Sequence, residues 1–323
     1  MAERSELTIC SVYYSSLNKD LLELNWELVN KLNSSKNWVW LVADNTPTEV
    51  AGKIDGKKFQ VIPGAKYEDL PDYIRPWMKG SYHHTLAINN SLEYIKNRFA
   101  LFLDSDFYIV RPEWVTEIID HMKENNLAFF GVPWHPKHIK KYRYFPTIHS
   151  LFVDFGKVSK NDLIFSPQYE EILMPSFKTR LVRKAKKIFL KFLSAERRSI
   201  GESHDSGYAI FRKYKGNRKF KFECPKPVFM PERDLKAYPA ALSSANRILE
   251  KFLPDRFCFF PKKKNYYTEI GFSRFGYFDA VSQGWEEFIW KEKPFGFHLR
   301  GSYRLKSDSE SSVALVHQVL NSL

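Results

Sequence analysis

Apolar residues in the first third of the chain form short unbroken runs that alternate with helix-spaced stretches. The runs are rich in β-branched and aromatic residues and end in polar or turn-forming residues, which is typical of buried strands. They comprise residues 7–14, 38–43, 59–62 and 99–103. Helical spacing follows Asn18 and recurs over residues 81–97. Strands that are apolar on both faces and alternate with helices predict an α/β fold with a mostly parallel sheet and helices on both faces.

The pattern becomes less regular after about residue 110. Residues 127–132 and 149–154 are predicted strands, and residues 204–214 are a predicted short helix that follows a polar loop. We therefore interpret the chain as one continuous domain, with an N-terminal half at 1–110 and a less regular C-terminal half at 111–323.

Three of the predicted strands lead directly into polar residues. These are residues 13–16, then Asp44 with Asn45, and residues 104–106. In parallel α/β sheets, ligands bind beyond the carboxyl ends of the strands. We therefore expect the three strand ends to share one rim of the sheet and to form the binding site.

The strongest chemical signal is the pair Asp104 and Asp106. The two carboxylates are two positions apart at the end of an apolar strand, so they point to the same side of the chain. Neighbouring carboxylates repel each other, and a hard divalent cation such as Mn²⁺ or Mg²⁺ relieves this repulsion while it also binds substrate phosphates. Two solvated aspartates in a turn are the alternative, but the preceding series of strands and helices favours a metal site.

From residue 7 to about residue 214, the order of these parts resembles the GT-A glycosyltransferases, particularly the inverting family-2-like enzymes. The resemblance rests on the first strand, the strand that ends in Asp44, the helix at 81–97 and the Asp104-Ser105-Asp106 motif. It implies a Rossmann-like GT-A fold with a nucleotide-sugar-binding half at 1–110 and an acceptor-binding half at 111–323. It also implies transfer of a hexose or N-acetylhexosamine from a nucleotide sugar, with a UDP-sugar expected, to a hydroxyl of a glycan or lipid-linked acceptor, with inversion.

The same resemblance implies roles for individual residues. Asp44 would contact the nucleobase with Tyr14 and Ser15 beside it, and Asp104 with Ser105 would lie toward the ribose and the metal. Asp106 would ligate the metal directly. His84 and Asn89 lie on the helix that belongs to this likeness, although His83 and His84 stand where the family more often has small or basic residues.

A late histidine, His298, lies between aromatic residues in the segment 295–301. It resembles the histidine that completes the metal shell in many of these enzymes, and imidazole is a suitable ligand for borderline metals. Arg300 could then face the diphosphate. Without the upstream aspartates, the same histidine would be read as an ordinary core residue.

Inverting transfer also needs a general base that takes the proton from the acceptor hydroxyl. The loop 201–207 looks like the place where the family has an acidic base; Asp205 fits it best and Glu202 is the second candidate. Alternatively, Ser203 or Asp205 caps the helix that follows.

Two aromatic segments, 131–136 and 142–149, are predicted to flank the acceptor cleft. Trp134 would offer a stacking surface, and His135 or His149 a hydrogen-bond partner. An aromatic loop that packs on the sheet would have the same composition.

The net charge of +13 implies an anionic partner. Residues 177–198 contain nine Lys or Arg and one Glu, with apolar residues on one helical face. Such a helix suits an anionic membrane surface, and an ordinary surface helix is the alternative. We expect no nucleic acid as a partner, because no zinc-finger or RNA-binding signature accompanies the cations.

Three separated cysteines indicate neither disulfides nor a zinc site. The chain also lacks a signal-peptide pattern and any apolar stretch of the roughly 18 residues that a membrane span needs. We therefore expect a cytoplasmic protein, with peripheral binding to the inner face of a membrane as an option. Two other functions remain open: a haloacid-dehalogenase-like phosphotransferase, which also has Asp-x-Asp after an apolar strand, and a non-catalytic protein that binds glycans, other anionic ligands or nucleic acid.

Overall fold

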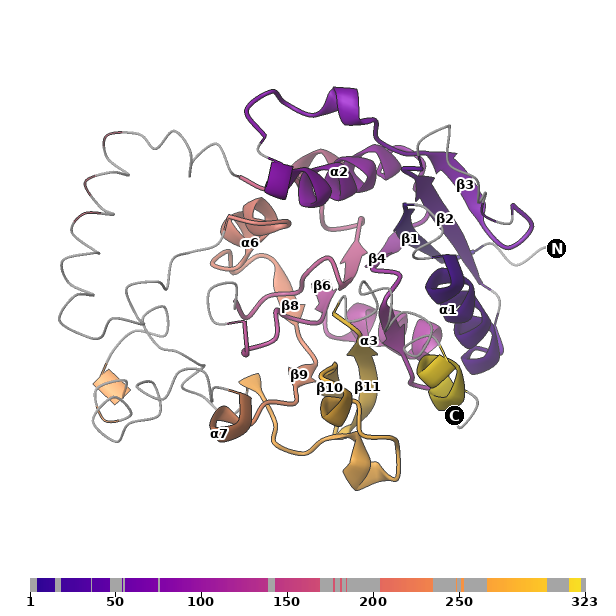
Figure 1. Ribbon diagram of the computed structural model, residues 1–323, viewed down its shortest axis with the longest axis vertical. Coiled ribbons are helices and arrows are strands. Elements are labelled where there is room, and N and C mark those ends of the chain that lie inside the picture. The colour runs from indigo at the N-terminus through magenta and orange to yellow at the C-terminus, as the bar shows by residue number, and fades with distance from the viewer. Residues whose placement is uncertain are drawn as a thin grey trace.

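Two β-sheets with helices packed against them make up the described part of the chain in the computed structural model (Figure 1). The structure describes residues 5–14, 19–35, 37–46, 54, 56–74, 76–138, 143–168, 177, 181, 184, 204–234, 248, 251–252, 266–300 and 314–320.

The first sheet has seven strands in the order β3-β2-β1-β4-β7-β6-β8. The strands are β1 (Leu7–Tyr13), β2 (Trp38–Asp44), β3 (Gln60–Pro63), β4 (Phe99–Leu103), β6 (Leu127–Gly131), β7 (Ser150–Asp154) and β8 (Lys221–Glu223). Neighbouring strands are parallel except at β7, which runs antiparallel to both β4 and β6. The predicted α/β class with a mostly parallel sheet is therefore confirmed.

Helices cover both faces of this sheet, because successive strand residues point to opposite sides. Leu7, Ile9 and Leu101 belong to one core cluster, which also contains residues of α1 (Lys19–Leu32) and α3 (Trp114–Glu124). The alternate strand residues belong to a second cluster, together with residues of α2 (Pro76–Ser91) and α6 (Tyr208–Tyr214). The continuous apolar runs in the sequence thus result from burial on two sides.

The helix predicted at 81–97 is shifted toward the N-terminus in the structure. It begins at Pro76 and ends at Ser91. Proline suits the first helical position because its fixed φ is helical and its missing N–H needs no partner there. At the other end, the Ser91 hydroxyl donates to the Ile88 carbonyl, and the chain turns toward β4. The predicted helix at 204–214 begins later, at Tyr208.

A second, four-stranded sheet was not predicted. It consists of β5 (Phe107–Ile109), β9 (Lys226–Pro227), β10 (Glu286–Trp290) and β11 (Lys293–His298), all antiparallel, in the order β5-β11-β10-β9. Short strands give a weak sequence pattern, and the turn between β10 and β11 has positive φ at Lys291 (48°) and Glu292 (55°). Such turns normally contain Asn or Gly, so this turn has no sequence signal.

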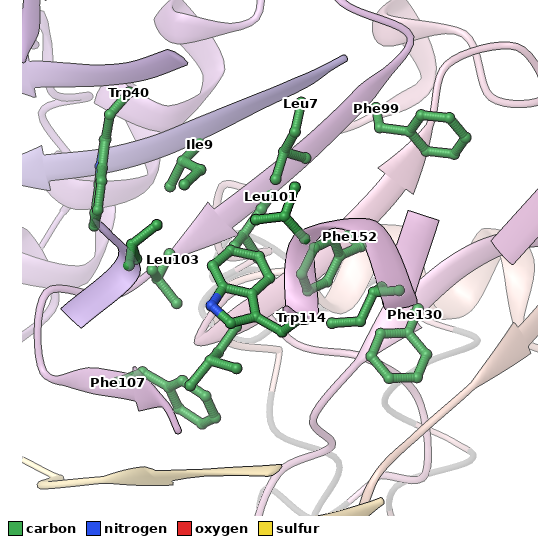
Figure 2. Close-up of a cluster of buried hydrophobic side chains, with 14 of the residues drawn as sticks. Leu7, Ile9, Trp40, Phe99, Leu101, Leu103, Phe107, Trp114, Phe130 and Phe152 are labelled. Carbon is green, nitrogen blue, oxygen red and sulfur yellow. The ribbon is translucent and has the colours of Figure 1, made fainter. Parts of the chain in front are cut away.

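The two sheets share one apolar core, which surrounds Trp114. Figure 2 shows the Trp114 ring among Leu101, Phe107 and Phe152, and the same cluster includes side chains from β10 and β11. The chain passes from β4 of the first sheet to β5 of the second within residues 104–106. The two aspartates of the motif therefore lie where the sheets join.

Glu287 on β10 holds the segment that precedes this strand. Its buried carboxylate accepts hydrogen bonds from the backbone N–H groups of Phe272 and Ala280, both at 2.7 Å, and of Val281. This segment contains the 3₁₀ turns η8 (Phe272–Phe275) and η9 (Val281–Gln283). Charged acceptors of backbone N–H groups are strongly stabilising when both partners are buried.

The remaining short elements lie at the periphery. They are η2 (Tyr67–Asp69), η3 (Lys160–Asp162), α7 (Pro231–Asp234) and a helix at 314–320. The last of these packs on α1, where the Lys31 ammonium donates to the Leu320 carbonyl at 3.0 Å. Among the described residues, no helix has the length and apolarity to cross a membrane.

Candidate active site

The ends of β1, β2 and β4 lie next to one another at one edge of the first sheet. Tyr13 pairs with Asp44 in parallel register, and Asn45 donates its backbone N–H to the Tyr13 carbonyl. On the other side of β1, the Ser11 hydroxyl donates to the Leu103 carbonyl, one residue before Asp104. The structure thus brings together the three strand ends that the sequence singles out.

Tyr14 forms the open part of this rim. Its side chain is 38% exposed and makes edge contacts with Tyr67 and His83, whose rings stack at 4.3 Å. The Asn45 side chain connects the segments that carry these rings, because its amide donates to the His83 carbonyl and accepts from the Ala65 N–H. The neighbouring residue Ser15 lies outside the described residues.

Asp44 makes a local hydrogen bond, whereas Asn89 bonds to a loop that is distant in sequence. Asp44 Oδ1 accepts from the Thr46 N–H at 2.8 Å. The Asn89 amide donates to the Ser166 hydroxyl and accepts from the Phe165 N–H, so it holds the loop after β7 against α2. The structure therefore gives Asn89 a structural contact in addition to the ligand role that the sequence suggests.

Asp104 is bound by two histidines. His149 Nδ1 lies 2.7 Å from Asp104 Oδ2, and His84 Nε2 lies 3.7 Å from Oδ1. Burial disfavours the negative charge of the Asp104 carboxylate. The hydrogen bond from His149 and the electrostatic attraction of the nearby histidines outweigh burial and hold the pKa of Asp104 below its usual range. Ser105, between the two aspartates, is buried.

His149 reaches Asp104 through strand pairing rather than sequence proximity. β7 runs antiparallel to β4, so Ser150 pairs with Leu103 and the preceding His149 lies beside Asp104. Gly131 permits this arrangement, because an added Cβ there would lie 1.9 Å from the Ser150 carbonyl oxygen. The sequence predicts His149 as a hydrogen-bond partner in the acceptor cleft. The one feature that points to the rim of the sheet instead is the position of His149 at the start of a predicted strand.

Asp106 pairs with His298 in the interior. Asp106 Oδ1 lies 3.1 Å from His298 Nε2, and His298 Nδ1 lies 3.4 Å from Glu286 Oε2. Burial opposes the charge on the imidazole, yet the two carboxylates raise the pKa of His298 to about 9. Glu286 is 1% exposed. No sequence feature pointed to it, because nothing in its local pattern distinguishes it from Glu287.

Arg300 lies over these groups. Its Nε lies 3.2 Å from His138 Nε2, and its Nη1 lies 3.3 Å from His149 Nε2. Since a guanidinium only donates, His149 Nε2 accepts and the His149 proton is on Nδ1, toward Asp104. Burial lowers the pKa of His149 to about 4, so this ring is neutral at pH 7.

Trp134 is not the open stacking surface that the sequence suggested. It is 5% exposed, and the Arg300 guanidinium lies 4.1 Å from the centre of its ring. The edge of His149 contacts it as well, with ring centres 4.6 Å apart. Trp134 therefore packs against Arg300 and His149 instead of facing an acceptor sugar.

One group of side chains has the arrangement of a metal site. Asp104, His149 and His298 offer ligand atoms that all lie within 4.8 Å of one another. One carboxylate and two imidazoles suit a divalent transition metal better than Mg²⁺, which prefers oxygen ligands. The residues present thus fit a divalent cation, and they include Asp104 and His298 of the set predicted from the sequence.

The predicted base Asp205 is buried and paired. Arg143 Nη2 lies 2.6 Å from Asp205 Oδ1 and also donates to the Ser206 carbonyl. The alternative in which Asp205 caps the next helix is wrong, because Gly207 occupies the cap position and makes no side-chain cap hydrogen bond, whereas Ser203, the other cap candidate, lies outside the described residues. Glu202, the second candidate, lies outside the described residues.

Comparisons with known proteins find matches among solved structures only, and these have low sequence identity and low TM-scores. No protein-family model matches the sequence, and no curated protein matches it. Among solved structures, S. aureus TarS matches with 15% identity over 50% of this chain and 30% of TarS, at a TM-score of 0.34. The galactosyltransferase LgtC, in complex with donor and acceptor sugar analogs, matches with 16% identity over 46% of this chain and 57% of LgtC, at 0.33.

A third structure is the mannosyltransferase PcManGT from Pyrobaculum calidifontis in complex with GDP-Man and Mn²⁺. It has 11% identity over 77% of this chain and 79% of its own, at a TM-score of 0.34. This chain spans less than two thirds of TarS and of LgtC. Similarities of this size establish neither family membership nor activity.

His135 is not available to an acceptor, contrary to the sequence interpretation. It is 3% exposed, and its Nε2 lies 2.9 Å from the Val228 carbonyl oxygen. Burial lowers its pKa from 6.5 to about 4. Because the unfolded chain takes up this proton at a higher pH, His135 destabilises the fold as the pH falls from about 6.5 toward 4.

We therefore expect the wild-type protein to lose more stability on acidification than His135→Gln, which keeps a donor for Val228. Between pH 7 and pH 5 the extra loss should be about 2 kcal/mol in the free energy of unfolding. Denaturant titrations at the two pH values measure it, with His317→Gln, a change at an exposed side chain, as the control. Equal losses for the wild type and His135→Gln would show that His135 titrates normally in the fold.

Proposed function

We propose that this protein is a metal-dependent glycosyltransferase that moves a sugar from a nucleotide-sugar donor to a hydroxyl of a glycan or lipid-linked acceptor. The observation that supports it best is the position of Asp104 and Asp106. They lie at the carboxyl end of β4, next to the ends of β1 and β2, and are surrounded by His149, His298 and a cationic side chain.

Asp104, His149 and His298 are the residues that would hold the ion, with Asp106 as the second carboxylate against His298. When bound, a divalent cation would neutralise the charge that develops on the diphosphate leaving group. Of the two ions expected from the sequence, Mn²⁺ and Mg²⁺, the transition metal Mn²⁺ tolerates imidazole ligands better.

The protein's own residues would position the donor on either side of this ion. Tyr14 is half-exposed at the rim and offers a ring face to a nucleobase, with Asp44 beside it as a hydrogen-bond acceptor. Arg300 would turn part of its guanidinium from His138 and His149 to the diphosphate, since its side chain is 22% exposed. A UDP-sugar is the donor that the sequence resemblance suggests, and a hexose or N-acetylhexosamine is the sugar.

The general base is part of the same proposal. Asp205 has the chemistry for it, but its carboxylate is buried against Arg143. This pair would have to open before Asp205 could accept a proton from an acceptor hydroxyl. Inversion at the anomeric carbon depends on this step.

A haloacid-dehalogenase-like phosphotransferase fits the structure less well. In those enzymes the Asp-x-Asp motif opens the domain, whereas here three strands of the sheet, β1, β2 and β3, precede it. Asp106 is also buried against His298 rather than exposed for proton transfer.

The test of the proposed function is turnover of a panel of UDP-, GDP- and dTDP-sugars in the presence of Mn²⁺. We expect slow hydrolysis of one donor, abolished by a chelator and lowered on the order of 100-fold or more by Asp106→Ala, since the site would lose the carboxylate that pairs with the proposed ligand His298 and with it several kcal/mol of transition-state stabilisation. Asp120→Ala, at an exposed aspartate on α3, is the matched control. Phosphatase activity that survives Asp106→Ala would favour the dehalogenase interpretation instead.

Binding to an anionic membrane surface remains part of this proposal. Most of residues 177–198 lies outside the described residues, but Phe177 and Leu181 are described and are 82% and 60% exposed. These apolar side chains are one helical turn apart, as on a helix that lies in a membrane interface. A protein held at the membrane surface would also reach a lipid-linked acceptor more easily.

We expect the wild-type protein to sediment with vesicles that contain anionic lipid, and replacement of Lys184, Lys186 and Lys187 by Glu to abolish this, because basic residues near such a surface contribute about 1 kcal/mol each. Vesicles of neutral lipid serve as the control. If the wild-type protein stays in the supernatant at low salt, the membrane part of the proposal is wrong.

A further inference from the structure

Glu286 is a buried acid that the proposed site does not yet explain. It lies on β10, and its carboxylate is 1% exposed. Removing a carboxylate from water costs several kcal/mol unless it is well paired. A Gln or an aliphatic residue would be cheaper at a purely structural position, so the partners of this charge indicate what it does.

Both oxygens of Glu286 face groups of the candidate active site. Oε2 lies 3.4 Å from His298 Nδ1. Oε1 lies 2.6 Å from His138 Nε2 and 3.5 Å from Arg300 Nε. Lys137 Nζ, at 3.4 Å from Oε1, adds a further positive charge on this side.

These contacts join the two aspartates of the motif through one continuous path. The path runs from Asp104 through His149, Arg300, His138, Glu286 and His298 to Asp106. Every step is a polar contact of 3.4 Å or less. Glu286 is the residue that connects His298 to Arg300, because one of its oxygens faces His298 and the other faces His138 and Arg300.

We propose that Glu286 is a positioning residue that orients His298 toward the metal ion and holds Arg300 beside it. The proposal rests on the proposed function, since it assumes that His298 ligates a divalent cation.

The chemistry of imidazole explains why a carboxylate is suited to this position. If His298 binds an ion through Nε2, the nitrogen that faces Asp106, its proton is on Nδ1, which lies 3.4 Å from Glu286 Oε2. Carboxylates that accept from a metal-bound histidine fix the ring and raise the basicity of its ligand nitrogen. Glutamine at 286 would have one acceptor oxygen instead of two. It could therefore accept a hydrogen bond from His138 or from His298, but not from both.

The test uses Mn²⁺ alone, with the free ion followed by electron paramagnetic resonance during titration of the full-length protein. We expect Glu286→Gln to weaken Mn²⁺ binding about 10- to 100-fold, the range found for such supporting carboxylates. The electron spin-echo signal of directly coordinated ¹⁴N, present in the wild-type complex, should weaken as His298 leaves the ion.

Glu287→Gln is the matched control, because its side chain lies on the opposite face of the same strand and binds backbone N–H groups of residues 272–281. It should lower the unfolding temperature and leave the Mn²⁺ dissociation constant within about twofold.

The outcomes separate this inference from the function on which it rests. A wild-type protein that binds no Mn²⁺ overturns the metal site itself and the role of Glu286 with it. Equal Mn²⁺ affinities and equal ¹⁴N signals for the wild type and Glu286→Gln overturn the positioning role alone. An equal loss of affinity in Glu287→Gln also overturns it, because the effect would then come from a general loss of stability.

Discussion

The structure depends on how three acids, of which Asp106 and Glu286 are buried and Asp104 is half-buried, are compensated where its two sheets join. Asp104, Asp106 and Glu286 lie within one network, and each would be costly to bury without a partner. Their partners are imidazoles and a guanidinium, whose N–H groups take the place of water as hydrogen-bond donors to the carboxylates. The low pKa of Asp104 and the pKa of about 9 for His298 are two consequences of the same pairing.

The fold makes this compensation possible by joining elements that are distant in sequence. β4 supplies the aspartates at its end, β7 brings His149 beside them through antiparallel pairing, and β11 brings His298 through its pairing with β5. The three-residue passage from β4 to β5 is one place where the chain connects the sheets, and the passage from β8 to β9 is another. A small shift of either sheet would therefore change the distance between carboxylates and histidines, so the packing around Trp114 supports the site as well as the fold.

The sequence predicts the part of this architecture that local patterns encode. The apolar runs of β1, β2 and β4 locate the rim, and Asp104 and Asp106 stand out because they follow a strand that is apolar on both faces. His298 was found only by resemblance. The contact of His149 with Asp104 spans 45 residues and that of Glu286 with His138 spans more than 100, so no local spacing reveals either role, and the sequence predicts His149 in the acceptor cleft instead. The second sheet was missed for a similar reason: its strands are short, and Lys291 and Glu292 form a turn without glycine or asparagine. Trp134 shows the opposite error, since an aromatic residue in a loop was taken for a ligand surface although Arg300 covers it.

The central claim is that a divalent cation binds between these acids and histidines, at the rim where a nucleotide would lie. Anomalous diffraction at the manganese edge, from crystals grown with Mn²⁺ and a nucleoside diphosphate, would test it most directly. The account predicts one strong peak within bonding distance of Asp104 and His298, with the diphosphate beside it. It would be contradicted by a nucleotide bound elsewhere on the molecule, or by a manganese peak remote from a site whose side chains remain hydrogen-bonded only to one another.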